Sequence, residues 1–363
     1  MPIGHMTGIY QSGQLRHNIP PILYAAVGAG DLLIHLDNAI DFEPMAGWNF
    51  KVDCDIGGMG CDAYGRPRWE YTPDAGDAGD HTWTIYGRYG GQTLWSLQRT
   101  LTVSAGTSTS TIKLVSIGDS NLDETLADQK RVLLASGMTV THVGTNNDST
   151  TDSAGTSQNA DHEGYGGRTL ASFMTQAPFA PAGSVDWSTW ISTHSFGAGH
   201  VAILGGLGTN DMYSQATDAA AAAVAATWPA NLESLIGMSA SPPAGSLKQL
   251  VPGAIVLIDM PIPGASAEAF KSTGVDPWQL RRNLWRLRNT LMQYGTAAYR
   301  GRGIYLIGTH LGVPPERGFM HSMAAISDVD SPQVSRASNA VHMDEPGYWN
   351  VGTDRAAAVI ALA

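Results

Sequence analysis

Cysteine, basic residues and long apolar runs are all scarce in this sequence, and each shortage excludes a class of structure or partner. Only two of 363 residues are cysteines, so a metal cluster held by cysteine ligands is excluded. Lys and Arg number 21 against 32 Asp and Glu, and the resulting formal net charge of −11 argues against nucleic acid as a partner. No apolar run approaches the roughly 20 residues that span a bilayer, so we predict no transmembrane segment.

The two cysteines lie close together in the chain. Cys54 and Cys61 flank a segment that contains Gly57, Gly58 and Gly60, and such a segment could bend to close a disulfide. Two free, partly buried thiols are the alternative.

The N-terminus gives no sign of export. Residues Met1–Met6 have neither a basic start nor an apolar core, so no signal peptide is visible. A cytoplasmic location is the default expectation. Secretion or association with a virion would require a removed export signal or another route.

The residue pattern changes near residue 110, which predicts two domains, 1–110 and 111–363. The first part has short aromatic segments separated by Gly, Asp and Pro, a spacing that favours an antiparallel β-sandwich. The segments are Asp31–Leu36, Trp48–Cys54, Thr82–Tyr86 and Thr93–Val103. The small polar residues of Ser104–Thr111 then predict a flexible linker.

The second part alternates apolar strands with amphipathic helices, which predicts an α/β fold with a parallel sheet covered on both faces. The strands are expected at Ile112–Ile117, Met138–Val143, His200–Gly205, Ala254–Met260 and Gly303–Gly308. Helices are expected at Leu122–Ser136, around Ala219–Ala226, after the capping residue Asp276, and at Tyr348–Leu362. In such sheets ligands bind at the carboxyl ends of the strands, where we look for chemistry.

The strongest chemical signal is Ser120 in the segment Val115–Asn121, where an apolar strand runs through a tight turn into a helix. A serine at this point projects its hydroxyl over the strand end. The first N–H groups of the helix can stabilise a developing oxyanion. Gly118-Asp119-Ser120 alone is weak, because these are ordinary turn residues, but its place after the first strand strengthens it.

A second glycine-rich segment, Gly205–Asp211, also follows a strand directly. Its Asn210 amide is a neutral donor suited to an oxyanion. An ordinary turn that caps the next helix is the alternative. A dinucleotide-binding loop is disfavoured because Asp211 occupies the place of the third glycine.

Two further segments complete the candidate site. His162–Thr169 is a glycine-rich loop that could supply a backbone N–H, although an ordinary mobile loop is the alternative. Near the C-terminus, His342 could accept the proton of a serine hydroxyl, because the pKa of histidine suits a general base. A histidine at the surface without a role is its alternative.

Together these four segments resemble conserved blocks of the SGNH (GDSL) hydrolase family, in the expected order over residues 112–363. The resemblance implies a three-layer, flavodoxin-like domain with a five-stranded parallel sheet. It implies Ser120 as nucleophile, His342 as general base and an oxyanion hole made by Ser120 N–H, Gly167 N–H and the Asn210 side chain. Gly167 is preferred to Gly164 and Gly166 because Gly167-Arg168-Thr169 fits the family's Gly-x-(Ser/Thr) pattern best. No metal or organic cofactor is implied.

One position departs from the family, which usually has Asp three residues before the histidine, whereas this chain has Asn339. An Asn can accept a hydrogen bond from the imidazole but carries no charge to stabilise an imidazolium. Three outcomes are open, of which we favour the first. Asn339 or a backbone carbonyl orients a Ser–His dyad; another acid, Asp328, Asp330 or Asp344, takes the role; or the enzyme is slow.

The N-terminal part resembles the Ig-like β-sandwich that precedes the catalytic domain in some bacterial members of this family. Its tryptophans could form a sugar platform, although core packing is favoured for most of them: Trp48, Trp69, Trp83 and Trp95. Its spaced acids could suggest calcium, but the spacing does not fit an EF-hand and a solvated turn is favoured: Asp74, Asp77 and Asp80.

The sequence therefore predicts a carboxylic ester hydrolase with a small-molecule or glycan ester as substrate, of acetylesterase type on a carbohydrate. A lipase, lysophospholipase or thioesterase using the same residues is the first alternative. A carbohydrate-binding or adhesion protein with a decayed site is the alternative from outside the enzymes. The sequence makes no prediction about the oligomeric state.

Overall fold

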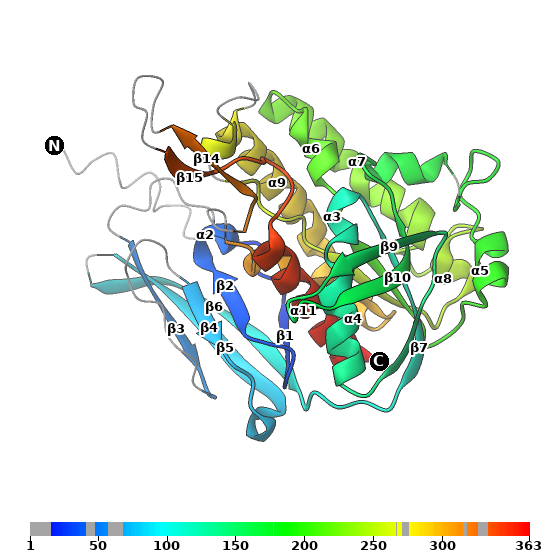
Figure 1. Cartoon of the computed structure of the whole chain (residues 1–363), viewed down its shortest axis with the longest axis horizontal. Coiled ribbons are helices and arrows are strands. Elements are labelled where there is room, and N and C mark those ends of the chain that lie inside the picture. The colour runs from blue at the N-terminus through cyan, green and yellow to red at the C-terminus, as the bar shows by residue number, and fades with distance from the viewer. Residues whose placement is uncertain are drawn as a thin grey trace.

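A computed structural model describes residues 16–40, 48–56, 68–89, 91–176, 178–265, 267–270, 276–314, 318–325 and 333–363 (Figure 1). The N-terminal part is built from two small β-sheets that pack beside a larger mixed α/β part. Among the described residues, no helix combines the length and the apolar character needed to cross a bilayer.

The two N-terminal sheets contain four strands in the order β1-β6-β5-β3 and two strands, β2 and β4. Their elements are β1 (Ile22–Ala26), β2 (Leu32–His35), α2 (Leu36–Ala39), β3 (Trp48–Cys54), β4 (Arg68–Tyr71), a 3-10 turn (Ala75–Asp77), β5 (Gly79–Tyr89) and β6 (Gln92–Ser104). Apolar side chains of both sheets share one core. The pair β1–β6 is parallel, so the predicted antiparallel arrangement is wrong for β1, whose other face packs on the C-terminal helix.

Most of the aromatic and acidic residues that the sequence analysis considered in this part either pack in the core or form hydrogen bonds within the protein. Trp69 and Trp83 are buried in the core and Trp95 packs against it, while the side chain of Trp48 lies outside the described residues. Asp74 and Asp77 belong to a hydrogen-bonded turn, in which Gly76 N–H donates to Asp74 and the Tyr71 hydroxyl donates to Asp77, whereas Asp80 lies in β5. Cys54 carries a free thiol, and Cys61 lies outside the described residues.

The large sheet has seven strands, two more than the sequence predicts. Its strands are β7 (Thr111–Gly118), β8 (Thr139–His142), β9 (Asn146–Thr151), β10 (Ser157–Gly164), β11 (Val201–Gly205), β12 (Ile255–Asp259) and β13 (Ile304–Ile307). Pairing is parallel through β8-β7-β11-β12-β13. β10 also pairs in parallel with the end of β7, and β9 pairs antiparallel with β10. The predicted number of five strands is therefore wrong, because the sheet also contains β9 and β10. The sequences of these two strands are polar and have no apolar periodicity.

Helices cover both faces of the large sheet, giving three layers (Figure 1). α4 and α11 pack on one face and α7 and α9 on the other. Successive side chains of a strand point to opposite faces, so β7 contributes to both layers. Its Ile112 and Leu114 face α4 and α11, and its Val115 and Ile117 face α7 and α9. The long helices are α4 (Leu126–Ala135), α7 (Asp218–Ile236), α9 (Pro277–Leu291) and α11 (Glu345–Leu362).

Shorter elements connect these layers. They are α3 (Ser120–Asp123), α5 (Ser188–His194), α6 (Thr209–Tyr213), α8 (Leu247–Leu250), α10 (Ala297–Arg300), the hairpin strands β14 (His321–Ala325) and β15 (Gln333–Ala337), and 3-10 turns at Leu170–Met174, Ala267–Phe270, Met292–Gly295 and Thr309–Leu311. The predicted helix Leu122–Ser136 is thus two helices, α3 and α4, which separate at Thr125. At that residue the Thr125 hydroxyl donates back to the Leu122 carbonyl at 2.5 Å.

The connection between the two parts is packed, which corrects the predicted flexible linker. Gly106 has a positive φ of 72°, and a Cβ there would lie 1.9 Å from the Val27 carbonyl oxygen. Ser108 N–H donates to the Ser136 carbonyl at 2.9 Å. Tyr24 of β1 also packs in the same cluster as α11. The N-terminal part is therefore joined to the α/β part by shared core as well as by chain.

Candidate active site

Ser120 begins α3 directly after β7, at the carboxyl edge of the parallel strands. Asp119 caps this helix, because its Oδ1 accepts a hydrogen bond from Asn121 N–H at 2.9 Å. Glycine is required at position 118, where a Cβ would lie 1.9 Å from the Gly205 carbonyl oxygen of β11. This tight turn leaves the Ser120 side chain only partly buried.

The loop between β15 and α11 brings His342 to the serine, although 222 positions separate the two residues. Ser120 Oγ and His342 Nε2 are 2.8 Å apart, which is hydrogen-bond distance. The loop is held by a backbone bond in which Ala265 N–H donates to the Ala340 carbonyl at 3.2 Å. The structure therefore places the predicted nucleophile and the predicted base in contact.

Asn339 also meets the histidine, but with the opposite end of its amide from the one expected. Its Nδ2 lies 3.2 Å from His342 Nδ1. Its Oδ1 accepts two backbone bonds, from Val341 N–H at 3.0 Å and from His342 N–H at 2.9 Å. Asn339 thus presents the NH₂ end of its amide to the imidazole ring, whereas the sequence interpretation expected its oxygen to accept from the ring.

The acids considered as replacements for Asn339 have other positions. Asp344 caps α11, because its Oδ1 accepts a bond from Gly347 N–H at 3.3 Å. Burial is the main cause that raises the pKa of Asp344. Asp328 and Asp330 lie outside the described residues.

Asn210 lies at the start of α6, after the end of β11, and its amide is bound to the serine turn. Nδ2 of Asn210 donates to Asp119 Oδ2 at 2.8 Å and to the Arg168 carbonyl at 3.3 Å. The side chain that the sequence assigns to an oxyanion hole is therefore next to the nucleophile turn. Its link to Asp119 was not predicted.

The glycine-rich segment is divided between strand and loop. His162–Gly164 ends β10, so only the residues after it form a loop, which corrects the prediction for the start of this segment. A Cβ on Gly166 would lie 3.9 Å from the Cβ of Ser120, while Gly167 has open space around it and a φ of 76°. The structure thus places Gly166 against the serine, and the oxyanion role of Gly167 stays a prediction.

Two buried carboxyl groups hold these segments in place. Asp211 accepts bonds from Leu170 N–H at 3.3 Å and from Trp228 Nε1 at 3.1 Å, which fixes the end of the glycine loop. Burial is the main cause that raises the pKa of Asp211 to about 6 and that of Asp119 to about 7. A proton can therefore bind and leave Asp119 near neutral pH, directly beside the Asn210 amide.

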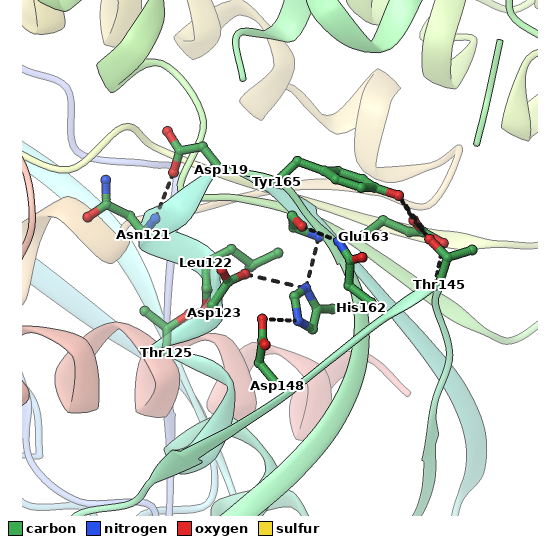
Figure 2. A network of polar contacts seen from close by, with 12 residues as sticks. Asp119, Asn121, Leu122, Asp123, Thr125, Thr145, Asp148, His162, Glu163 and Tyr165 are labelled. Carbon is green, nitrogen blue, oxygen red and sulfur yellow. Dashed lines mark hydrogen bonds and ion pairs between the residues drawn. The ribbon is translucent and has the colours of Figure 1, made fainter. Parts of the chain in front are cut away.

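His162 on β10 lies between the carboxyl groups of Asp123 and Asp148, as Figure 2 shows. His162 Nε2 is 3.1 Å from Asp148 Oδ2 and Nδ1 is 3.3 Å from Asp123 Oδ1. Gly164 N–H donates to Nδ1 at 2.9 Å, so Nδ1 is an acceptor and Nε2 carries the proton that Asp148 accepts. Since this bond occupies the Nδ1 lone pair, the trio does not fit a metal ion as it stands.

The carboxyl of Asp123 in this trio is expected to make stability depend on pH. Burial, aided by the charge of Asp148, raises its pKa to about 7. The folded chain thus keeps a proton that the unfolded chain has released, so this group's contribution to stability is present below about pH 4 and is lost as the pH rises to about 7. The variant Asp123→Asn lacks this loss, and its advantage over the wild type should grow from pH 4 to pH 8.

Denaturant unfolding of both chains at several pH values measures this difference, since the other titrating groups are common to both. Glu124→Gln, at the exposed residue next to Asp123, serves as the control and should give a smaller trend. A constant difference between Asp123→Asn and the wild type over this range would contradict the assignment.

The sequence analysis did not predict the buried hydrogen-bond network around Glu163, next to the glycine loop of the site. Glu163 is buried at the end of β10 and accepts bonds from Thr145 N–H and the Tyr165 hydroxyl (Figure 2). It also accepts a bond from Trp190 Nε1 at 2.6 Å. The signal in the sequence was two charged or titratable residues, His162 and Glu163, directly before a glycine loop. Such residues are buried only when they are hydrogen-bonded.

Comparisons with known proteins give weak likenesses. The chain matches no protein-family model and no curated protein. Among solved structures, a Streptococcus pneumonia protein named for platelet activating factor is 14% identical, with 67% of this chain and 81% of that chain covered and a TM-score of 0.38. Phospholipase A1 from Streptomyces albidoflavus is 11% identical, with 65% and 93% covered and a TM-score of 0.34.

An extracellular lipase from Streptomyces rimosus is 14% identical, with 66% of this chain and 97% of that chain covered and a TM-score of 0.31. These TM-scores are too low for the likenesses to carry an argument about fold or activity. The functional interpretation therefore depends on the geometry around Ser120.

Proposed function

We propose that this chain is a serine ester hydrolase of the SGNH/GDSL type, with Ser120 as nucleophile and His342 as its proton acceptor. The observation that carries the proposal is the 2.8 Å contact between Ser120 Oγ and His342 Nε2 at the carboxyl edge of the sheet. A serine hydroxyl becomes a useful nucleophile when an imidazole in hydrogen-bond contact takes its proton. That two loops from distant parts of the chain meet here supports a catalytic role over a surface histidine.

The reaction proceeds by two acyl transfers. Ser120 Oγ attacks the ester carbonyl carbon while its proton moves to His342 Nε2. The tetrahedral intermediate then collapses, the bond to the alcohol oxygen breaks, and the same proton passes to that oxygen. Water repeats the sequence: it gives a proton to Nε2, its oxygen bonds to the acyl carbon, the bond to Oγ breaks, and Oγ recovers the proton as the acid leaves.

The oxyanion is proposed to bind Ser120 N–H, Gly167 N–H and the Asn210 amide. Because Asn210 Nδ2 already donates to Asp119 and to the Arg168 carbonyl, an oxyanion must replace one of these partners. The bond to Arg168 is the longer, at 3.3 Å against 2.8 Å, and is the one that we expect the oxyanion to replace.

The proposed substrate is a short acyl ester, such as an acetyl group on a carbohydrate, and the residues 1–110 are proposed as an accessory domain beside the catalytic residues 111–363. The net charge of −11 and the lack of a long apolar segment support a polar substrate over a lipid droplet. A lipid ester is the second candidate. It is favoured by two exposed apolar side chains, Met320 and Met323, which are 42% and 62% exposed. They follow Phe319, which forms a β-bridge with Met343, the residue next to the histidine.

Labelling and turnover together test the proposal. A fluorophosphonate probe is expected to modify the wild type at Ser120, located by mass spectrometry of the peptide, and acetyl p-nitrophenyl ester should be hydrolysed faster than long-chain esters. Ser120→Ala should lose the labelling and most of the turnover, whereas Ser214→Ala, at an exposed serine of the α/β part, should keep both. Equal binding of glycan by the wild type and Ser120→Ala without any labelling would instead support a binding protein with a decayed site.

A further inference from the structure

The amide of Asn339 has one orientation that the surrounding backbone permits. Two N–H groups, those of Val341 and His342, point at the same oxygen, Oδ1, at 3.0 Å and 2.9 Å. Turning the amide over would place its NH₂ group against both donors and lose both bonds. Such a network decides which end of an amide is oxygen. The NH₂ group must then be the end that lies 3.2 Å from His342 Nδ1.

This orientation determines which nitrogen of the imidazole carries the proton. An NH₂ group can only donate, so Nδ1 of His342 must accept and has no proton of its own. A neutral imidazole with an unprotonated Nδ1 is protonated on Nε2. The bond at 2.8 Å therefore runs from Nε2–H to Ser120 Oγ, and the serine faces a proton donor.

We propose that Asn339 is a positioning residue that holds His342 in the Nε2–H tautomer, so that the resting dyad is restrained from acting as a base. The inference rests on the proposed function, in which Nε2 must accept the Ser120 proton. For that step the imidazole proton must first lie on Nδ1, where it would point at the Asn339 NH₂ group, donor against donor. The imidazolium formed during the reaction has the same conflict at Nδ1.

A carboxylate at this position removes the conflict without changing the backbone contacts. In Asn339→Asp one oxygen would still accept from Val341 N–H and His342 N–H, and the other would accept a proton from Nδ1–H. Where the reverse change, Asp to Asn, was made in a serine protease triad, the wrong tautomer lowered kcat about 10⁴-fold. We therefore expect Asn339→Asp to raise ester turnover at neutral pH by up to about 10⁴-fold over the wild type.

The tautomer itself can be read without any activity. In protein labelled with ¹⁵N-histidine, the two ring nitrogens of His342 are identified by the signals that vanish in His342→Gln. The wild type should show a proton on Nε2 and none on Nδ1, and Asn339→Asp should show a proton on Nδ1. A wild-type spectrum with the proton on Nδ1 overturns the inference. Asn339→Ala, which removes the NH₂ group, should shift population toward the Nδ1–H form and serves if Asn339→Asp does not fold.

Turnover gives the second readout and separates the two ideas. Asn49→Asp, at an exposed residue of β3, adds the same charge away from the histidine and should leave turnover unchanged. If the wild type hydrolyses esters through Ser120 but Asn339→Asp has the same rate, the inference fails and the proposed function stands. If neither chain is labelled at Ser120 or hydrolyses any ester, the proposed function fails, and the nitrogen signals still decide the tautomer.

Discussion

Alanine at position 120 is expected to lower the turnover of an acetyl ester about 10²-fold in the wild-type chain and about 10⁶-fold in the Asn339→Asp chain. Loss of the nucleophile or the base from a complete triad costs about 10⁶ in kcat. An Asn in place of the carboxylate already forfeits about 10⁴ of that. The remaining contribution of Ser120 in the natural chain is therefore about 10².

The same reasoning applies to His342, and the two changes should not add. Because Ser120 and His342 act through one hydrogen bond, His342→Ala should match Ser120→Ala in each background, and the double variant should be no slower than either single one. Steady-state kinetics on all six variants and the two parent chains measures the cycle. Losses that multiply, or that are equal in the two backgrounds, would contradict the coupling of Asn339 to the dyad.

Part of the site's position followed from the sequence, because Ser120 and Asn210 each come shortly after a recognisable apolar segment. Ser120 follows β7 and Asn210 follows β11, and the carboxyl ends of neighbouring parallel strands lie together. His342 had no such strand before it. Its prediction came from the suitability of histidine as a general base and from the resemblance of its short segment, and the structure places it at hydrogen-bond distance from the serine.

The sequence could not give the orientation of side chains within the site. Asn339 was expected to accept from the imidazole, but its oxygen is bound by the backbone of its own loop, which no residue pattern reveals. The bond from Asn210 to Asp119 depends in the same way on how two loops pack. These two orientations affect which atoms donate and accept hydrogen bonds in the site, although the candidate residues are the ones that the sequence predicts.

Elements of the fold were predictable where apolar periodicity was strong. The capping residue Asp276 and the buried stripe of α9 are as the pattern predicts, with Asp276 accepting from Trp278 N–H at 2.9 Å. The β9–β10 hairpin was missed because its residues are mainly polar, and the buried end of β10 contains His162 and Glu163 rather than an apolar run. Its place in the sheet is set by parallel pairing of two residues with β7. Polar edge strands of this kind carry no period-two signal.

Loss of the guanidinium of Arg355 is expected to be the most destabilising single change at the base of the site. Arg355 Nη2 is 2.6 Å from Asp259 Oδ2, with side chains 1% and 4% exposed. The Nη1 group also contacts the Thr125 hydroxyl, where α3 ends and α4 begins. Removing one partner of a buried ion pair leaves the other charge without compensation, which costs about 3–5 kcal/mol. We expect Arg355→Met to lower the free energy of unfolding by this amount.

Proton binding gives this prediction a pH dependence and a control. Burial raises the pKa of Asp259, and Arg355 opposes that rise. Without Arg355 the carboxyl must take up a proton or stay charged, so the loss should be larger at pH 8 than at pH 5.

Arg282→Met, which removes an exposed partner of Asp218 at 3.4 Å, should leave the unfolding midpoint nearly unchanged. The pair Arg355→Met with Asp259→Leu should recover much of the stability, because neither member of the ion pair is then left buried without the other. A double variant as unstable as Arg355→Met would mean that the bond to Thr125, and through it the end of the helix that carries Ser120, is what Arg355 stabilises.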